Sequence, residues 1–155
     1  MVLVKAMHHV SNKIRKLTLK NFNLDEATAK SLACIIPFIV DIEEMEFANN
    51  QLMDHVAAAL VLAFFQNPSL HKMTITYNFL RASFCRTLTE MIRAQPEKIT
   101  SLNLMGSIAN SDHMEHICKN LEFFTKLISL NFSGNNFSVN TCRILGNFMT
   151  SSCSL

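Results

Sequence analysis

The chain has 155 residues, of which 49% are hydrophobic and 17% charged, with 14 Lys and Arg against 12 Asp and Glu. The net charge of +2 is scattered along the chain, which argues against the basic stripe of a nucleic-acid-binding surface. The longest apolar run, 56–65, is about half of what a membrane span needs, and the N-terminal order of apolar and charged residues does not fit a signal peptide. We therefore expect a cytoplasmic protein with neither nucleic acid nor a membrane as its partner.

Apolar residues return at a regular interval along the chain. The residues Ile14, Ile42, Leu70, Ile99, Leu127 and Leu155 follow one another in steps of 28, 28, 29, 28 and 28 residues. Such a period indicates one supersecondary unit stacked on copies of itself. Counted from each start residue (offset 0), offsets +3 and +5 stay apolar at strand spacing, and offsets +15, +18 and +22 stay apolar at helix spacing. Each repeat is predicted to form a strand, a turn, a helix and a return loop.

The predicted elements alternate along the chain. Residues 1–13 are expected to form the second half of a helix that lacks its strand. The strands and helices that follow are expected near 15–20 and 25–36, 43–48 and 53–66, 71–76 and 81–94, 100–105 and 111–123, and 128–133 and 138–150. Leu155 would begin a sixth strand. Both ends thus interrupt a repeat, and we expect a longer chain or neighbouring subunits to cover the apolar side chains exposed there.

Three segments carry a recurring motif: 42–52 (IEEMEFANNQL), 70–80 (LHKMTITYNFL) and 127–137 (LISLNFSGNNF). They resemble the leucine-rich-repeat pattern L-x-x-L-x-L-x-x-N-x-L, and the period is similar to that of the ribonuclease-inhibitor-like subclass. The resemblance implies an α/β fold: one leucine-rich-repeat solenoid over 1–155, shaped as a horseshoe arc. Its five repeats start at 14, 42, 70, 99 and 127, with partial repeats at both ends, and it has parallel strands on the concave face and helices on the convex face.

The asparagine position of this motif, offset +8, is not uniform. It is occupied by Phe22, Asn50, Asn78, Ser107 and Asn135. In the family this side chain binds backbone groups of its own turn and of the neighbouring repeat, which would otherwise be buried without partners. Ser107 can supply part of that bonding and Phe22 cannot, so we expect the ladder of side chains to be broken at the first repeat.

Alternation along the strands places offsets +2, +4 and +6 on the solvent side of the sheet. A protein partner would meet the concave face there, and the candidate contact residues are Lys16, Thr18, Lys20, Glu44, Glu46, Lys72, Thr74, Thr76, Tyr77, Asn103, Met105 and Asn131. Lys16, Glu44 and Lys72 should lie side by side, about 5 Å apart. They could form a salt-bridge ladder that keeps the sheet soluble, or a binding patch.

Tyr77 is the best single anchor candidate for a partner. Binding hot spots favour Trp, Tyr and Arg, and this chain has no Trp and one Tyr. At offset +7, Tyr77 should sit where the sheet meets the loop at its edge. The alternative is a packed edge residue.

Residues typical of catalytic or metal chemistry form no convincing constellation. The sequence has no Gly-rich phosphate loop, no G-x-S-x-G and no H-E-x-x-H. His113 and His116 share a helix face beside Asp112 and Glu115 but lack a third ligand. No pair among the five cysteines is well placed for a disulfide, so they are interpreted as small buried hydrophobes in a reducing compartment. No enzyme, cofactor or metal is expected.

The sequence therefore favours a non-enzymatic protein–protein interaction scaffold, a segment or subunit of a larger intracellular assembly. By resemblance, cytoskeletal or ciliary scaffolds and actin-filament regulators of the tropomodulin type are candidates. One alternative is a recognition segment of an immune-sensor or bacterial-effector protein with the same repeats. Another is a small-GTPase regulator, which would want a catalytic or orienting residue on a loop rim and an acidic flank, and neither is visible. A ribonuclease inhibitor is disfavoured, because it would call for an acidic concave face rich in Trp and Tyr.

Overall fold

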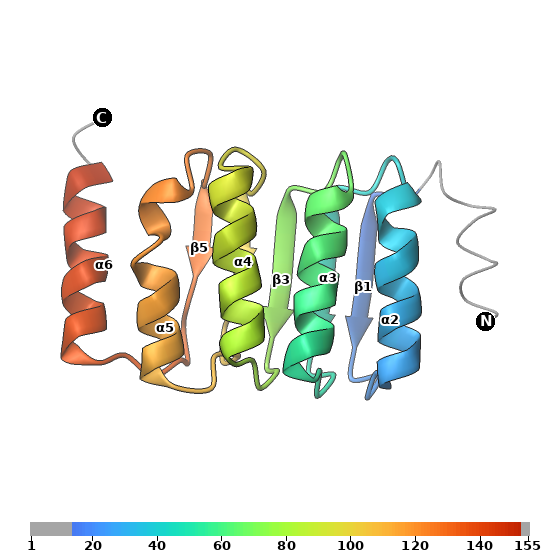
Figure 1. Ribbon diagram of the computed structural model, residues 1–155, viewed down its shortest axis with the longest axis horizontal. Helices are drawn as coiled ribbons and strands as arrows, with labels where there is room; N and C mark the ends of the chain where they lie inside the picture. The colour runs from blue at the N-terminus through green and yellow to red at the C-terminus, as the bar shows by residue number, and fades with distance from the viewer. Residues whose placement is uncertain (1–13, 153–155) are drawn as a thin grey trace.

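The computed structural model describes residues 14–152, and the expectations for 1–13 and Leu155 lie outside these residues. Five strand–helix units lie side by side in chain order (Figure 1). The strands are β1 (Lys16–Lys20), β2 (Glu44–Ala48), β3 (Lys72–Thr76), β4 (Ser101–Asn103) and β5 (Ser129–Asn131). The helices are α2 (Glu26–Ile35), α3 (Asp54–Gln66), α4 (Ala82–Ala94), α5 (Ser111–Cys118) and α6 (Val139–Ser152). Short 3₁₀ turns at Ile36–Phe38 and Leu121–Phe123 follow α2 and α5.

The five strands form one parallel sheet in the order β1-β2-β3-β4-β5, and the helices cover one of its faces (Figure 1). Equivalent offsets pair across every step, as Lys16 with Glu44, Glu44 with Lys72, and Lys72 with Ser101 show. The predicted α/β architecture with parallel strands is therefore confirmed. The 28–29-residue period is the physical cause, because each repeat places the same side chain at the same height of the sheet.

The last two strands are shorter than predicted. Strands near 100–105 and 128–133 were expected, and three residues of each pair in the sheet. The side chains of Asn103 and Asn131 accept hydrogen bonds from the backbone N–H groups of Met105 and Ser133, two residues further on. Such local bonds favour a turn over an extended strand, so the strands end early.

The core lies between the sheet and the helices, and its coverage falls at the two ends of the stack. At offset +3, Met45, Met73 and Leu102 are fully buried. Leu17 and Leu130, at the same offset in the first and last repeats, are only partly buried. Interior repeats are covered by neighbours on both sides, and the outer repeats are covered on one side by the described residues.

Helix starts are fixed by side-chain caps, one of which crosses between repeats. Asp25 caps its own helix α2 by accepting from the Thr28 N–H at 2.9 Å. Asp54, the first residue of α3, instead accepts from three backbone N–H groups at the start of α4, at 2.6–3.2 Å. Burial opposes ionisation of Asp54, yet these hydrogen bonds outweigh it and lower the pKa of the carboxyl. Helices α3 and α4 are therefore tied together by one carboxylate.

The three prolines lie just beyond helices, as predicted from the sequence. Pro68 and Pro96 each lie two residues beyond the last residue of α3 and α4, and Pro37 lies in the 3₁₀ turn after α2. A proline removes a backbone donor and disfavours the α conformation of the residue before it. The chain then returns to the next strand.

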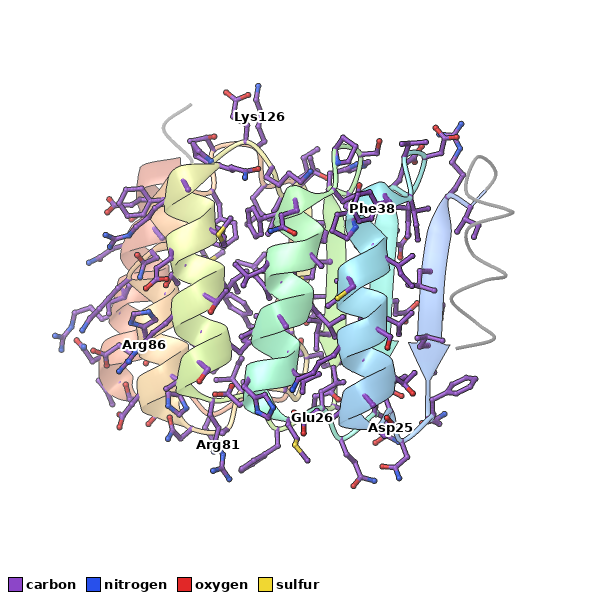
Figure 2. The ribbon with its side chains drawn as sticks, turned by 45° about the vertical axis from the view of Figure 1, so that its right-hand side comes forward. Asp25, Glu26, Phe38, Arg81, Arg86 and Lys126 are labelled. Carbon is purple, nitrogen blue, oxygen red and sulfur yellow. The ribbon has the colours of Figure 1, made fainter. Side chains whose placement is uncertain are left out.

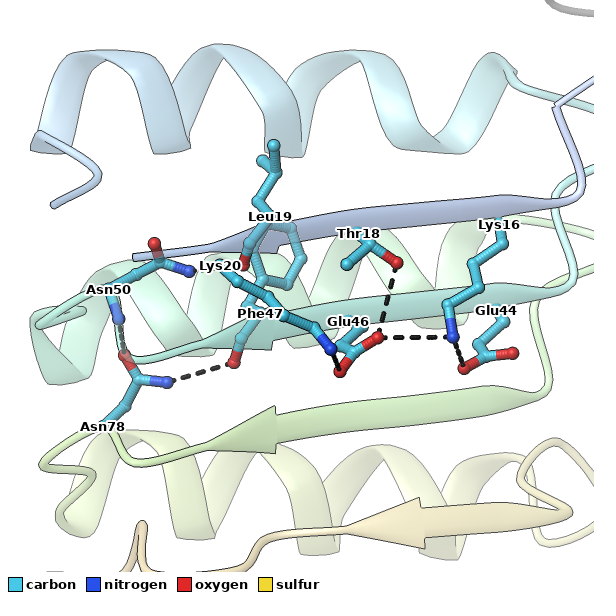
Figure 3. Close-up of polar contacts among 9 residues, drawn as sticks. All are labelled: Lys16, Thr18, Leu19, Lys20, Glu44, Glu46, Phe47, Asn50 and Asn78. Atoms are coloured by element: carbon cyan, nitrogen blue, oxygen red, sulfur yellow. Dashed lines mark hydrogen bonds and ion pairs between the residues drawn. The ribbon is translucent and has the colours of Figure 1, made fainter. Parts of the chain in front are cut away.

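A ladder of buried side chains at offset +8 joins the repeats (Figure 3). Asn78 Nδ2 donates to the Phe47 carbonyl, and its Oδ1 accepts from the backbone N–H groups of Asn50 and Leu52, all at 3.1–3.2 Å. Asn50 binds the Leu19 carbonyl and the Phe22 N–H in the same way. In each step the side chain bonds to the offset +5 carbonyl of the preceding repeat and to that repeat's backbone N–H groups.

The two departures from asparagine behave as predicted. The Ser107 hydroxyl donates to the Ile75 carbonyl at 2.8 Å and accepts from the Asn78 N–H at 3.2 Å, so it continues the ladder with one oxygen. Phe22 has no polar side-chain atom and is 67% exposed, so it contributes nothing to the ladder. Its own N–H is bound by Asn50, and the ladder of side chains stops there.

The cysteine prediction was only half right. Among the described residues all cysteines are free, and Cys85 and Cys118 are buried. Cys34 and Cys142 are exposed. Cys34 lies at offset +20, a helix position that faces solvent in the other repeats too, as Leu62, Glu90 and Lys119 show. Cys142 lies on α6, the last helix of the stack, where no further described helix packs against it.

We expect Asn78→Ala to lower the free energy of unfolding by about 2–4 kcal/mol, because the buried N–H groups of Asn50 and Leu52 and the Phe47 carbonyl lose the hydrogen bonds that the Asn78 side chain makes. Urea denaturation followed by circular dichroism measures the change. Asn147→Ala, at an exposed position of α6, is the matched control and should stay within about 0.5 kcal/mol. Equal effects from both substitutions would contradict the role given to the ladder.

Candidate protein-binding surface

The face of the sheet opposite the helices, here called the open sheet face, carries offsets +2, +4 and +6 as predicted. The register places Lys16, Glu44, Lys72, Ser101 and Ser129 in one row. The next row is Thr18, Glu46, Thr74, Asn103 and Asn131. No described helix lies over this face (Figure 1), so both rows are available for contact.

A compact charge network occupies the β1–β2 part of the open sheet face (Figure 3). Lys16 Nζ lies 2.6 Å from Glu44 Oε1 and 3.3 Å from Glu46 Oε2. Lys20 Nζ lies 2.7 Å from Glu46 Oε1, and Thr18 Oγ1 donates to Glu46 Oε2. The side chain of Glu46 is only 13% exposed as a result. Its carboxylate is already fully engaged, and we do not expect it to be a primary partner contact.

The network shifts the pKa values of its members in opposite directions. Burial works against the charged form of Glu46, but the hydrogen bonds from Lys20 and Lys16 outweigh it and hold the pKa of the carboxyl below its ordinary value. The hydrogen bond to Glu44 raises the pKa of Lys16, against some desolvation. Both shifts favour the ion pairs, so the network is intact at neutral pH.

Of the two interpretations of the row Lys16, Glu44 and Lys72, a salt-bridge ladder or a binding patch, the ladder forms only in part, between Lys16 and Glu44. Lys72 lies beside Glu44 in the register, yet among residues 14–152 it takes part in no ion pair and its side chain is exposed. Glu44 has its carboxylate on Lys16 instead. A lysine can reach along its own strand as well as across strands, so the sequence order of charges does not determine the pairs. Lys72 is left as an uncompensated positive charge on the open sheet face.

The remaining predicted residues differ in their accessibility. Thr74 and Met105 are half-buried. Asn103 and Asn131 use their Oδ1 atoms in the turns described above. Thr76 was expected to face a partner and is 4% exposed, which is a correction. It is short and lies on the central strand, with Ala48 at the equivalent offset on one side and Met105 on the other, so the neighbouring repeats cover it.

Tyr77 is an exposed residue in an unusual backbone conformation. Offset +7 is left-handed in all five repeats, with φ of +58°, +51°, +53°, +60° and +71° at Asn21, Asn49, Tyr77, Gly106 and Gly134. Asparagine and glycine tolerate this region, whereas a bulky aromatic residue there is an outlier. The Tyr77 ring is 56% exposed, and its hydroxyl contacts Met105 Sδ at 3.6 Å. The predicted anchor is thus placed at the surface.

The neighbouring glycine makes room for this ring. A Cβ added at Gly106 would lie 2.9 Å from Tyr77 Cδ1 and 3.0 Å from Cε1. The ring therefore rests against the backbone of the next repeat. Tyr77 combines the two readings made from sequence, because it is packed along one side and exposed on the other.

Several exposed side chains lie in the loops between strand and helix, and of these only Tyr77 is predicted from the sequence as a contact residue. We call this set, Phe22, Met53, Tyr77, Phe79 and Arg81, the strand-to-helix rim. Phe22, Met53 and Phe79 are 67%, 56% and 62% exposed, and the Arg81 guanidinium lies 5.1 Å from the centre of the Phe79 ring. Arg81 lies at the same edge of the molecule as Asp25, opposite Lys126 (Figure 2). Apart from Tyr77, the one signal in the sequence was Phe22 at a motif asparagine position.

The histidine pair does not form a metal site. Among the described residues no three His, Cys, Asp or Glu side chains converge in a way that could hold a metal ion. His116 Nε2 lies 3.0 Å from Thr89 Oγ1 on the neighbouring helix. Across the described part of the chain, no helix is both long and apolar enough to cross a membrane.

Comparison with known proteins bears on the fold. No protein-family model matches the chain. Two solved structures superpose on 97% of it with TM-scores of 0.73: the leiomodin-1 actin-binding site 2, at 14% identity and 90% of that chain, and the Caenorhabditis elegans tropomodulin C-terminal domain, at 15% identity and 93% of that chain. The chain is also 26% identical over 152 residues to the human NACHT, LRR and PYD domains-containing protein 13.

The fold is of the leucine-rich-repeat type. The match to the human protein covers 96% of this chain but only 14% of that protein. At these identities the two structural matches speak for the fold alone. The resemblance inferred from the motif is therefore confirmed at the level of the repeat architecture.

We expect Glu46→Gln to lower stability at pH 7 by about 1–2 kcal/mol, because two charge-assisted hydrogen bonds are weakened. The folded-state pKa of Glu46 is lowered, so this stabilisation is present above the ordinary carboxyl pKa and is lost as pH falls through the folded value. Urea titrations between pH 7 and pH 3 should show the two proteins converging. Glu90→Gln, at an exposed α4 position, is the control, and a Glu46→Gln deficit that does not shrink as the pH falls would contradict the explanation.

We expect Gly106→Ala to destabilise the fold by about 1–3 kcal/mol, because alanine is strained at φ +60° and its Cβ meets the Tyr77 ring. Adding Tyr77→Ala should recover the part of the loss due to the ring and leave the backbone part. A double-mutant cycle by thermal or urea unfolding measures the coupling. Strict additivity of the two substitutions would show that the ring does not press on this glycine.

Proposed function

We propose that this chain is a non-enzymatic protein-interaction module of a cytoplasmic, cytoskeletal assembly, with protein partners and no nucleic-acid or membrane partner. The observation that carries the proposal is the open sheet face, which no described element covers and which ends in the strand-to-helix rim. It combines an uncompensated cation, Lys72, with exposed aromatic side chains and Arg81, and this is the composition of binding hot spots. Its carboxylates are engaged in ion pairs, which fits a binding surface better than an acid–base site.

The two superposed structures support the cytoskeletal class of partner. One is titled an actin-binding site, and the other is a tropomodulin domain. Actin is therefore the first partner to test. The proposal includes two further features of the architecture. The repeats are of the ribonuclease-inhibitor-like subclass, which the 28–29-residue period and the helix in every repeat support. The stack forms an arc, and the open sheet face lies on its concave side.

Tyr77→Ala is expected to weaken binding to actin about tenfold, which corresponds to 1.4 kcal/mol. Lys72→Glu should weaken it in a salt-dependent manner, because a positive charge on the face becomes negative. Co-sedimentation with filamentous actin and pyrene-actin assembly assays provide the two measurements.

Lys126→Glu is the matched control for these substitutions, because it makes the same charge change at an exposed loop position before β5, opposite Arg81 and outside the two rows of the open sheet face (Figure 2). It should leave binding unchanged, and circular dichroism should show all three variants folded. Failure of the wild-type chain to bind actin in either assay would exclude actin as the partner. Equal losses from Lys72→Glu and Lys126→Glu would exclude the open sheet face as the site.

A second candidate function follows from the 26% identity with the human NACHT, LRR and PYD domains-containing protein 13. In this reading the chain is a recognition segment of an immune-sensor protein, and the open sheet face selects a non-cytoskeletal ligand. The two readings differ in the actin assays. No actin binding, together with cross-linking of a non-cytoskeletal protein to a photoreactive residue placed at Lys72, would favour the sensor.

A further inference from the structure

The start of α4 presents a hydroxyl group in an accessible position. Ser83 is the second residue of this helix and is exposed. Arg81, two residues earlier, is also exposed and lies at the edge of the molecule (Figure 2). In the whole sequence no other serine or threonine has an arginine two residues before it. An exposed serine with a guanidinium just upstream is the charge pattern that arginine-directed serine kinases select.

The charge of Arg81 is available to an enzyme that approaches this edge. Its guanidinium lies 5.1 Å from the centre of the Phe79 ring. Among residues 14–152 it takes part in no ion pair. A carboxylate of a second protein could therefore pair with it without displacing a partner from this chain.

Ser83 also lies directly against the carboxylate that ties α3 to α4. Its backbone N–H donates to Asp54 Oδ2 at 2.8 Å, beside the N–H groups of Arg81 and Phe84 on Oδ1. Burial raises the pKa of Asp54, but these hydrogen bonds, with one from the Ser83 side chain, lower it overall. The carboxylate is therefore ionised at neutral pH, and the Ser83 hydroxyl lies next to its negative charge.

We propose that Ser83 is a phosphorylation site and that its phosphate releases the tie between α3 and α4. In the reaction, Ser83 Oγ attacks the γ-phosphorus of a nucleoside triphosphate. The new Oγ–P bond replaces the bond from that phosphorus to the nucleoside diphosphate, which leaves, and the hydroxyl proton passes to solvent. The product carries a charge of about −1.5 to −2 at neutral pH.

The new charge would lie beside an ionised carboxylate. Two anions at this distance repel each other, and the first N–H groups of α4 cannot serve both fully. The phosphate is held covalently at the start of α4 and carries the larger charge, so it takes over these N–H groups. Asp54 then turns away, and α4 keeps an anionic cap while its link to α3 is lost.

The site is tested on the folded chain with the catalytic subunit of an arginine-directed serine kinase and Mg–ATP. We expect one phosphate, located on Ser83 by intact-mass measurement and peptide mapping. Arg81→Gln should slow the reaction at least about tenfold, because the guanidinium that the kinase selects is gone. Ser31→Ala, at an exposed serine of α2, is the matched control and should leave the reaction unchanged.

A peptide of residues 76–88 separates the sequence from its accessibility in the fold. Phosphorylation of the peptide but not of the folded chain would show that Ser83 is out of reach in the native structure, and would overturn the proposal. Failure of both, or an unchanged rate for Arg81→Gln, would overturn it as well.

The release of the tie is measured by thermal unfolding of the chain before and after phosphorylation. We expect the midpoint to fall by about 3 °C, and to fall less at high salt, where the repulsion is screened. Asp54→Asn keeps the shape of the side chain and removes its charge, so phosphorylation of this variant should not lower the midpoint.

No fall in the wild-type midpoint, or equal falls in the wild type and Asp54→Asn, would overturn the release. If Asp54→Asn does not fold, the salt series decides, and a fall that is independent of salt would overturn it. None of these measurements involves actin, so their outcome is separate from that of the proposed function.

Discussion

The bond from each buried offset +8 side chain to the repeat before it is the constraint on which the rest of this structure depends. Each repeat has a turn between its strand and its helix, and stacking buries backbone N–H and carbonyl groups of this turn that neither the sheet nor the helices can pair. Asn50, Asn78, Ser107 and Asn135 pair them across the layer boundary. Because each side chain reaches back to a fixed offset of its predecessor, the register of the sheet follows from the ladder as well as from the strands.

Much of the fold could be predicted because the repeat is redundant. Equivalent positions such as Met45, Met73 and Leu102 are apolar and buried in each repeat, so a wrong assignment at one position is corrected by the others. Local competition escaped this reasoning. Asn103 and Asn131 end their strands by accepting a hydrogen bond from the backbone N–H two residues further on. The repeat pattern shows which residue type recurs at an offset, but it does not show which hydrogen bond one particular side chain makes.

The surface could be predicted less well, because position on a face does not determine what a long side chain does there. The alternation correctly placed Lys16, Glu44 and Lys72 in one row. It could not show that Glu46 would draw two lysines and leave Lys72 unpaired. The rim residues Phe22 and Phe79 lie in turns, where period-based reasoning has least to say and where the solvent exposure of a side chain depends on the exact path of the loop.

The carboxylate of Asp54 has a consequence for how such a chain can change over evolution. It starts α3 yet serves as the cap for α4, accepting from Arg81, Ser83 and Phe84. The second repeat thus carries the carboxylate that caps the helix of the third repeat. Repeats of this kind are often treated as interchangeable cassettes, but deleting, duplicating or shuffling either of these two would separate a helix from its cap. We therefore expect changes in repeat number to be tolerated better where they keep these two repeats together than where they separate them.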